Sequence, residues 1–220
     1  MIIIDSRGQR WGVWTKKGTC MNEKFFDLKK EKQDRMINAA LKVFANNGYA
    51  HASTDEIVKE AGISKGLLFH YFTNKISLYS FIYEYSARYI CLEMTSMVDR
   101  TDNDYFSIYL NIRNAEAQVM RSYPYMILFL RSTENENVIE AMNELYDKKD
   151  IVPNKIQEFF DHANTSHIKT GVDTHMLDEM IKFTSDAVLL KTLRENEDRP
   201  EKYYDEVKQY ILTLKNIANK

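Results

Sequence analysis

One short stretch, residues 54–75, constrains the fold more than any other part of the chain. It reads TDEIVKEAGISKGLLFHYFTNK. Ser53 or Thr54 can cap a helix whose first turn carries two acidic residues, where the helix dipole favours negative charge. Gly62 tolerates the left-handed backbone that ends a helix. We therefore predict a short helix that is followed at once by a tight turn.

The second half of the stretch predicts another short helix. Ser64 is a second N-cap candidate, and residues 65–71 would form the helix. Leu68 and Phe72 lie four positions apart and are predicted to face inward together. Two helices joined by a glycine turn make a helix-turn-helix, a motif whose second helix can lie in the major groove of DNA.

The remaining side chains around the second helix are predicted to face solvent. They combine positive charge, hydrogen-bonding tips and aromatic rings, in Lys65, Phe69, His70, Tyr71 and Lys75. A purely structural helix would carry acidic and basic pairs here, and bulky aromatic residues that face water need a partner. The pattern favours a surface that contacts DNA.

At this point the sequence resembles a known family. Between residues 32 and 78, the segments AALKVFANNGY, TDEIVKEAGISKG and LFHYFTNK follow one another at fixed spacing. They are similar to the DNA-binding domain of the TetR family of transcriptional regulators. The resemblance implies an all-α homodimer, with an N-terminal three-helix helix-turn-helix domain and a C-terminal helical domain for ligand binding and dimerisation.

The resemblance also implies roles for individual residues. The start of the first helix would hold a phosphate, Lys65 would reach a guanine edge, and Phe69 would contact a thymine methyl group. The positions implied in DNA contact are Ser53, Thr54, Ser64, Lys65, Gly66, Leu67, Phe69, His70, Tyr71 and Lys75.

Two of these positions depart from the commonest family pattern. Leu67 stands where a small hydroxyl residue is frequent, and Phe69 stands where a tyrosine is frequent. Both replacements lose a hydrogen-bonding group. We therefore expect a more apolar readout of the DNA, with thymine-rich sites.

Composition agrees with a helical chain. Only 7 Gly and 3 Pro occur in 220 residues, too few for the turns of an all-β fold of this length. Cys20 and Cys91 have neither metal-like spacing nor a disulfide framework, so we expect a cytoplasmic protein. No apolar run is long enough for a membrane span, and no cofactor is expected.

Charge is unevenly distributed along the chain. Residues 1–80 hold 13 Lys and Arg against 8 Asp and Glu, whereas the remainder holds 17 against 24. A basic front end suits a surface that meets phosphates; the alternative is chance clustering, because a difference of a few charges is common.

Three segments are expected along the chain. Residues 1–21 are predicted to be a disordered or loosely ordered extension, residues 22–75 the DNA-binding domain, and residues 76–220 the sensing and dimerisation domain. The first 20 residues are interpreted as an upstream extension from a misassigned start. The alternative is an arm that reaches DNA through Arg7, Arg10, Lys16 and Lys17.

Apolar periodicity predicts a helix over 22–47 and further helices in the second half. Their ranges are 77–97, 102–122, 136–146, 152–162, 175–193 and 202–217, and residues 125–131 form a short apolar run. In the family resembled, the last pair forms a four-helix bundle with the partner subunit; the alternative is a core within one chain. The predicted dimer contacts are Met176, Met180, Phe183, Ala187, Leu190, Tyr203, Val207, Tyr210, Ile211 and Leu214.

Tyr, Phe and Met are abundant in residues 85–190, and such residues can line an adaptable apolar pocket, although most of them are core. A charged residue among them could fix a polar group of a small-molecule effector. The predicted pocket residues are Tyr89, Tyr109, Arg113, Met126, Phe129 and Phe183.

Two other classes of function are an enzyme and a protein-interaction module. Glu158, His162 and His167 could approach one another, but no metal-binding or nucleophile motif accompanies them, so we expect no enzyme. A helical protein-interaction module could reuse the helix-turn-helix shape without specific DNA binding. We favour a cytoplasmic, dimeric repressor that binds a palindromic double-stranded DNA operator and answers to an effector.

Overall fold

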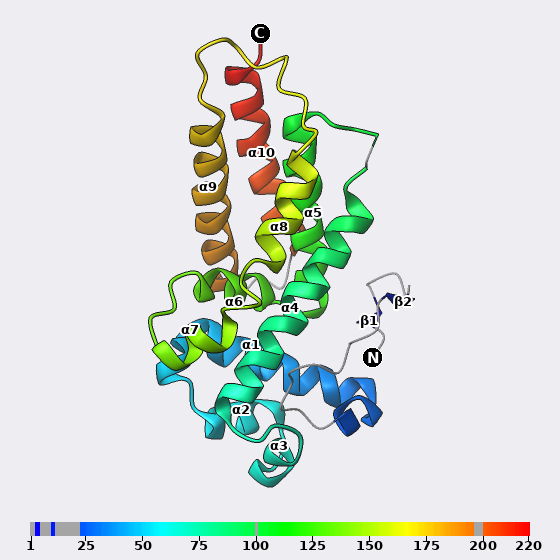
Figure 1. The fold of residues 1–220 in the computed structure, drawn as a ribbon, viewed down its shortest axis with the longest axis vertical. Coiled ribbons are helices and arrows are strands. Elements are labelled where there is room, and N and C mark those ends of the chain that lie inside the picture. The colour runs from blue at the N-terminus through cyan, green and yellow to red at the C-terminus, as the bar shows by residue number, and fades with distance from the viewer. Residues whose placement is uncertain (1–2, 5–9, 12–22, 100, 196–199) are drawn as a thin grey trace. The chain divides into compact units, whose positions relative to one another are not determined.

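The computed structural model describes residues 3–4, 10–11, 23–99, 101–195 and 200–220. The prediction of an all-α protein is confirmed: apart from two short strands, the described elements are helices (Figure 1). These are η1 Glu23–Asp27, α1 Lys30–His51, α2 Thr54–Ala61, α3 Lys65–Tyr71, α4 Lys75–Met97, α5 Tyr105–Ser122, α6 Met126–Thr133, α7 Ile139–Leu145, α8 Ile151–Phe160, α9 Thr174–Arg194 and α10 Pro200–Ala218.

The two strands fall in the predicted N-terminal extension. β1 (Ile3–Ile4) pairs antiparallel with β2 (Arg10–Trp11), and Ile3 lies opposite Trp11. The other residues of the segment 1–21, including Arg7, Lys16 and Lys17, lie outside the described residues. The expectation of a disordered or loosely ordered arm therefore stays a prediction.

The chain divides into two compact units. The first contains residues 1–89 and 125–151, and the second contains residues 90–124 and 152–220. Helices α6 and α7 thus pack with the N-terminal helices, although they follow α5 in the sequence. Helix α4 contributes to both units, with the change at residue 90.

The core of the first unit forms around α1. This helix carries an apolar stripe whose residues are buried: Met36, Ile37, Ala40, Leu41 and Phe44. The ring of Phe44 meets the rings of Tyr79 on α4 and Phe129 on α6, at centroid distances of 4.9 and 6.2 Å. Burying one large apolar side chain contributes about 1.5–3 kcal/mol, so this stripe holds α2, α4 and α6 against α1.

Both ends of α1 differ from the prediction of a helix over 22–47. A 3₁₀ turn (η1) comes first, and α1 begins only at Lys30. At the other end the backbone leaves helical geometry at Gly48 (φ 65°, ψ 176°), directly after the predicted end of the helix at residue 47. One further turn continues from there to His51.

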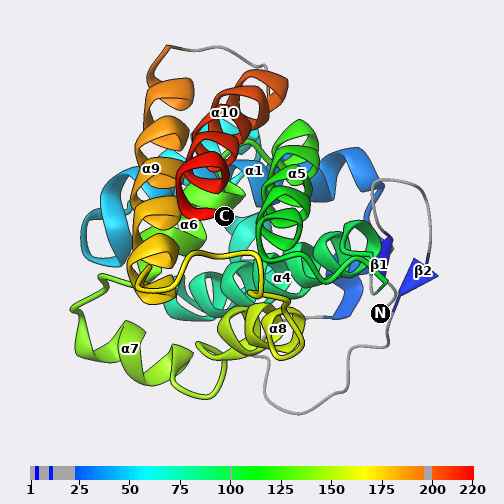
Figure 2. The same cartoon turned by 90° about the horizontal axis from the view of Figure 1, so that it is seen from above.

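The second unit contains α5, α9 and α10, together with the end of α4 and nearly all of α8. Helices α9 and α10 lie side by side in both views (Figures 1 and 2), and α10 also packs on α5. Asp104 begins α5 by accepting the backbone N–H of Ser107 at 2.9 Å, and it also accepts a hydrogen bond from Lys215 of α10 at 2.8 Å. Within the described ranges, no helix is long and apolar enough to cross a membrane.

Candidate nucleic-acid interface

The helix-turn-helix forms with the bounds that the sequence predicts. α2 begins after Ser53, whose hydroxyl oxygen accepts the N–H of Asp55 at 3.2 Å, so Ser53 and not Thr54 is the cap. Gly62 ends α2 in the left-handed conformation (φ 62°, ψ 44°). Ser64 caps α3 by accepting the N–H of Leu67 at 3.2 Å. Three local signals therefore fix the position of α3.

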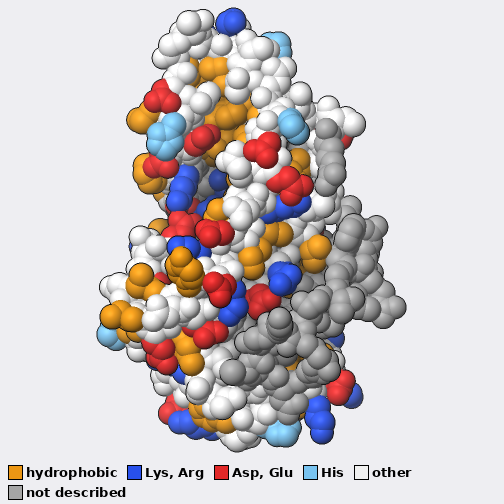
Figure 3. Space-filling model, in the orientation of Figure 1, with side chains coloured by type: hydrophobic (Ala, Val, Ile, Leu, Met, Phe, Trp, Pro, Cys, Tyr) orange, Lys and Arg blue, Asp and Glu red, His pale blue; other side chains and the backbone are white. Residues whose placement is uncertain are grey.

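Helix α3 has a buried face and an open one. Leu68 and the following Phe72 are each 1% exposed, as predicted. Phe69 is 38% exposed and lies beside the exposed His70 and Lys65. Figure 3 shows Lys and Arg side chains on the end of the first unit that α2 and α3 form. The open face thus combines cationic and aromatic groups.

Lys65 is held by a carboxylate of the neighbouring helix. Its Nζ lies 2.8 Å from Oδ1 of Asp55 and 3.0 Å from Oδ2, and both side chains are exposed. Because an exposed ion pair contributes only about 0–1 kcal/mol, the ammonium can exchange this partner for another acceptor. Gly66 follows, and a Cβ at that position would meet nothing within 4 Å.

Tyr71 does not face solvent as predicted. It is only 8% exposed, and its ring packs edge-on against Phe25 of η1 at a centroid distance of 5.7 Å. Phe25 also meets Phe72 and Phe81, each at 5.3 Å. The segment EKFFDLKK carries no helical signal that would have placed Phe25 in this core.

Lys75 also has a different environment from the predicted phosphate contact. Its Nζ donates hydrogen bonds to the backbone carbonyl oxygens of Tyr49, Ala50 and Ala52, at 2.7, 3.3 and 3.3 Å. It also lies 4.4 Å from the centroid of the Tyr49 ring. An ammonium has three N–H donors. All three N–H donors of Lys75 are engaged here, so its side chain binds the free carbonyl groups at the C-terminal end of α1.

The family comparison agrees with this geometry. A family model described as bacterial regulatory proteins of the tetR family matches residues 36–80, which contain most of α1, all of α2 and α3, and the start of α4. The likeness to the TetR family is thus shown for this helix-turn-helix region.

Curated proteins match the chain over about a fifth of its length. The HTH-type transcriptional regulator YuxN of Bacillus subtilis is 49% identical over 49 residues, which are 22% of this chain and 17% of the relative. The transcriptional activator FasR of Mycolicibacterium smegmatis is 41% identical over 49 residues, 22% of each protein. The matches thus span less than a quarter of these relatives.

Solved structures share the TetR-family fold over most of the chain. The regulatory protein TetR from Rhodobacter sphaeroides matches with a TM-score of 0.56 and 19% identity, over 82% of this chain and 97% of that one. FadR from Bacillus subtilis in complex with stearoyl-CoA matches with a TM-score of 0.52 and 17% identity, over 80% and 96%. At these identities the likeness shows the fold alone.

The predicted pocket residues divide between the two units of the chain. Tyr89, Met126 and Phe129 belong to the first unit and are buried, and Phe129 packs against Phe44 and Tyr79. The second unit contains Tyr109, Arg113 and Phe183. Phe183 is 63% exposed on α9, so it does not line an enclosed cavity in this chain.

The predicted dimer contacts also separate into two sets. On α9, the five positions Met176, Met180, Phe183, Ala187 and Leu190 are all exposed. On α10, Tyr203, Val207 and Ile211 are no more than 1% exposed and belong to the core of their own chain, whereas Tyr210 is 47% exposed. Leu214 is partly exposed. Among the described residues, no cluster of His, Cys, Asp and Glu could hold a metal ion.

Proposed function

We propose that the protein is a cytoplasmic transcriptional repressor that binds a palindromic DNA operator as a homodimer and leaves it when a small, largely apolar effector binds. The open face of α3 carries the DNA part of this proposal. A seven-residue helix that exposes Lys65, Phe69 and His70, while its other face is buried, needs a partner of complementary charge.

The contacts on DNA follow from the chemistry of each group. The Lys65 ammonium would leave Asp55 and donate to O6 and N7 of a guanine, while Phe69 would pack on a thymine methyl group. His70 and the backbone amides at the start of α2, with Ser53 and Thr54, would hold phosphates. Gly66 would let the backbone approach the groove closely.

The exposed stripe on α9 supports a homodimer. Its residues recur at intervals of four and three positions, which places them on one side of the helix. The surface between α9 and α10 is hollowed beside Phe183, Ala187 and Tyr210, where side chains of a second copy can insert. In an isologous pair, the stripe of each subunit would cover that of its partner.

Effector release is the part of the proposal that rests on the family. The FadR structure named above holds stearoyl-CoA, a ligand with a long apolar chain. In this chain, movement of α4 would change the separation of the two α3 helices in the dimer. A few ångströms of mismatch would remove one α3 from its half-site.

Titration of operator DNA with Lys65→Ala tests the assignment of α3. We expect a loss of about 1–3 kcal/mol that is confined to one base position of each half-site. Lys208→Ala on α10 is the control and should leave affinity unchanged. Equal weakening on every sequence would reassign Lys65 to the phosphate backbone.

A further inference from the structure

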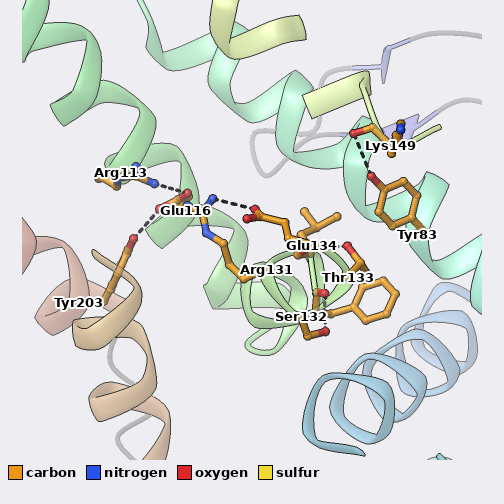
Figure 4. A network of polar contacts seen from close by, with 11 residues as sticks. Tyr83, Arg113, Glu116, Arg131, Ser132, Thr133, Glu134, Lys149 and Tyr203 are labelled. Carbon is orange, nitrogen blue, oxygen red and sulfur yellow. Dashed lines mark hydrogen bonds and ion pairs between the residues drawn. The ribbon is translucent and has the colours of Figure 1, made fainter. Parts of the chain in front are cut away.

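One ion pair joins the two helices of the helix-turn-helix on its open face. Lys65, the first residue of α3, places its Nζ 2.8 Å from Oδ1 and 3.0 Å from Oδ2 of Asp55, in the first turn of α2. The side chains of Lys65 and Asp55 are 52% and 70% exposed. A pair on α5 is the opposite case: Figure 4 shows Arg113 and Tyr203 reaching Glu116 from two helices, and the side chains of Arg113 and Glu116 are only 6% and 4% exposed. The pair of Lys65 and Asp55 is thus open to a ligand.

The Asp55 carboxylate is tied to α3 rather than to the cap of its own helix. Ser53 caps α2, and its hydroxyl oxygen accepts the backbone N–H of Asp55. Among the described residues, Lys65 is the hydrogen-bond and ion-pair partner of the carboxylate. Asp55 is therefore held by the residue that reads a base under the proposed function.

The other acidic residues of α2 are placed differently. Glu60, in the last turn, is paired with Lys42 of α1 at 2.6 Å. Glu56 is exposed and follows Asp55 directly. One step along a helix turns the side chain by about 100°. Glu56 therefore has the same charge in the same turn but points in another direction, which makes it a matched control for Asp55.

Binding of DNA by Lys65 changes the surroundings of Asp55. When the ammonium moves onto O6 and N7 of a guanine, the carboxylate loses its cation beside a polyanion. A carboxylate without a donor there raises the free energy of the complex, unless the DNA offers a hydrogen-bond donor at the same point. Asp55 therefore makes the affinity depend on what the DNA presents beside that guanine.

The donor that fits is the amino group of the paired cytosine. In a G·C pair, guanine O6 and cytosine N4 are joined by a hydrogen bond of roughly 2.9 Å, and both atoms lie on the major-groove edge. The free protein holds the ammonium of Lys65 and the carboxylate of Asp55 at nearly the same separation, 2.8 Å. In an A·T pair, thymine presents O4 at this point, an acceptor that cannot bond a carboxylate.

We propose that Asp55 is a specificity-determining residue that accepts a hydrogen bond from N4 of the cytosine whose paired guanine is bound by Lys65. The two side chains then read one G·C base pair together and fix its orientation, because the reversed pair opposes like groups. This proposal rests on the proposed function, since it needs Lys65 in the major groove.

Methylation of a single atom of the operator tests the proposal. N4-methylcytosine keeps its pair with guanine but presents a methyl group to the major groove in place of the N4–H. The duplex is the operator selected from a random pool, with each cytosine of one half-site methylated in turn, and fluorescence anisotropy measures binding. We expect about tenfold weaker binding by the wild type at one base pair, the pair where Lys65→Ala loses its preference for guanine.

Two matched variants assign the effect to Asp55. Asp55→Ala should bind the methylated and the unmethylated operator equally, whereas Glu56→Ala, which removes the same charge from the same turn, should keep the tenfold difference. Both positions are exposed and Ser53 still caps α2, so the two variants should unfold at similar temperatures. A methylation effect that persists in Asp55→Ala, or disappears in both variants, would overturn the proposal.

The selected motif keeps this test separate from the test of the proposed function. If a palindromic motif emerges but methylation of no cytosine weakens binding by the wild type, Asp55 has no part in the readout and the operator-binding regulator stands. If no motif emerges, the proposed function fails, and the role of Asp55 fails with it.

Discussion

At the scale of single residues, Lys75 provides the clearest correction to the sequence prediction. Lys75→Met keeps the aliphatic stem but leaves three carbonyl oxygens of the α1 end without their donor. We expect the free energy of unfolding to fall by about 1–3 kcal/mol, measured by urea denaturation. Lys59→Met, at an exposed position of α2, is the control. If the variant were as stable as the wild type but its DNA binding depended less on salt, Lys75 would be assigned to a phosphate contact after all.

Asp104 gives a prediction about pH. Burial raises the pKa of its carboxyl group, but the hydrogen bonds from Lys215 and from the Ser107 amide outweigh burial, so the folded pKa lies below the ordinary value. The stabilisation is therefore fully present above about pH 4, the unfolded pKa, and is lost as the pH falls through the folded pKa.

Asp104→Asn isolates this charge, because asparagine also caps helices well. We expect the variant to be less stable than the wild type by on the order of 1 kcal/mol at pH 7, and the difference to shrink as the pH falls below 4. Unfolding curves at pH 7 and pH 3 measure it. A difference of the same size at both values would mean that the charge is not responsible.

At the scale of elements, the two glycines around the turn should behave in opposite ways. Gly62 has a φ of +62°, and an added Cβ would lie 3.6 Å from Arg35, an ordinary contact. Gly62→Ala should therefore destabilise the protein by roughly 1–2 kcal/mol through the backbone alone. Gly66→Ala, in an open helical position, should be neutral or stabilising but should weaken DNA binding. Equal thermal stability of the two variants would contradict the assignment of the turn.

The elements that the sequence predicts most accurately are those with local signals. Ser53, Gly62 and Ser64 act on backbone groups within three residues, so the bounds of α2 and α3 could be read directly. Phe25 and Lys75 could not be placed, because their partners lie tens of residues away in the chain. The periodicity of α10 predicts a single face of dimer contacts. In the structure these residues fall into two sets: Tyr203, Val207 and Ile211 are buried in the core, and Tyr210 is exposed.

At the scale of the whole molecule, the α9 stripe predicts the oligomeric state. Met180 and Met142 are similarly exposed, at 47% and 51%, but Met180 lies on the stripe and Met142 on α7. Met180→Lys should shift the protein to monomer in sedimentation experiments, because it buries a charge in the interface. Met142→Lys should leave the dimer intact. The same dimer fraction in both variants would move the interface away from α9.

The most direct measurement is the selection of bound sequences from a random pool of double-stranded DNA by the purified protein, at two salt concentrations. We predict one palindromic motif with thymine-rich half-sites, bound more weakly at the higher salt concentration as phosphate contacts require. An intact dimer that enriches no motif at either concentration would contradict the assignment of the protein as an operator-binding regulator.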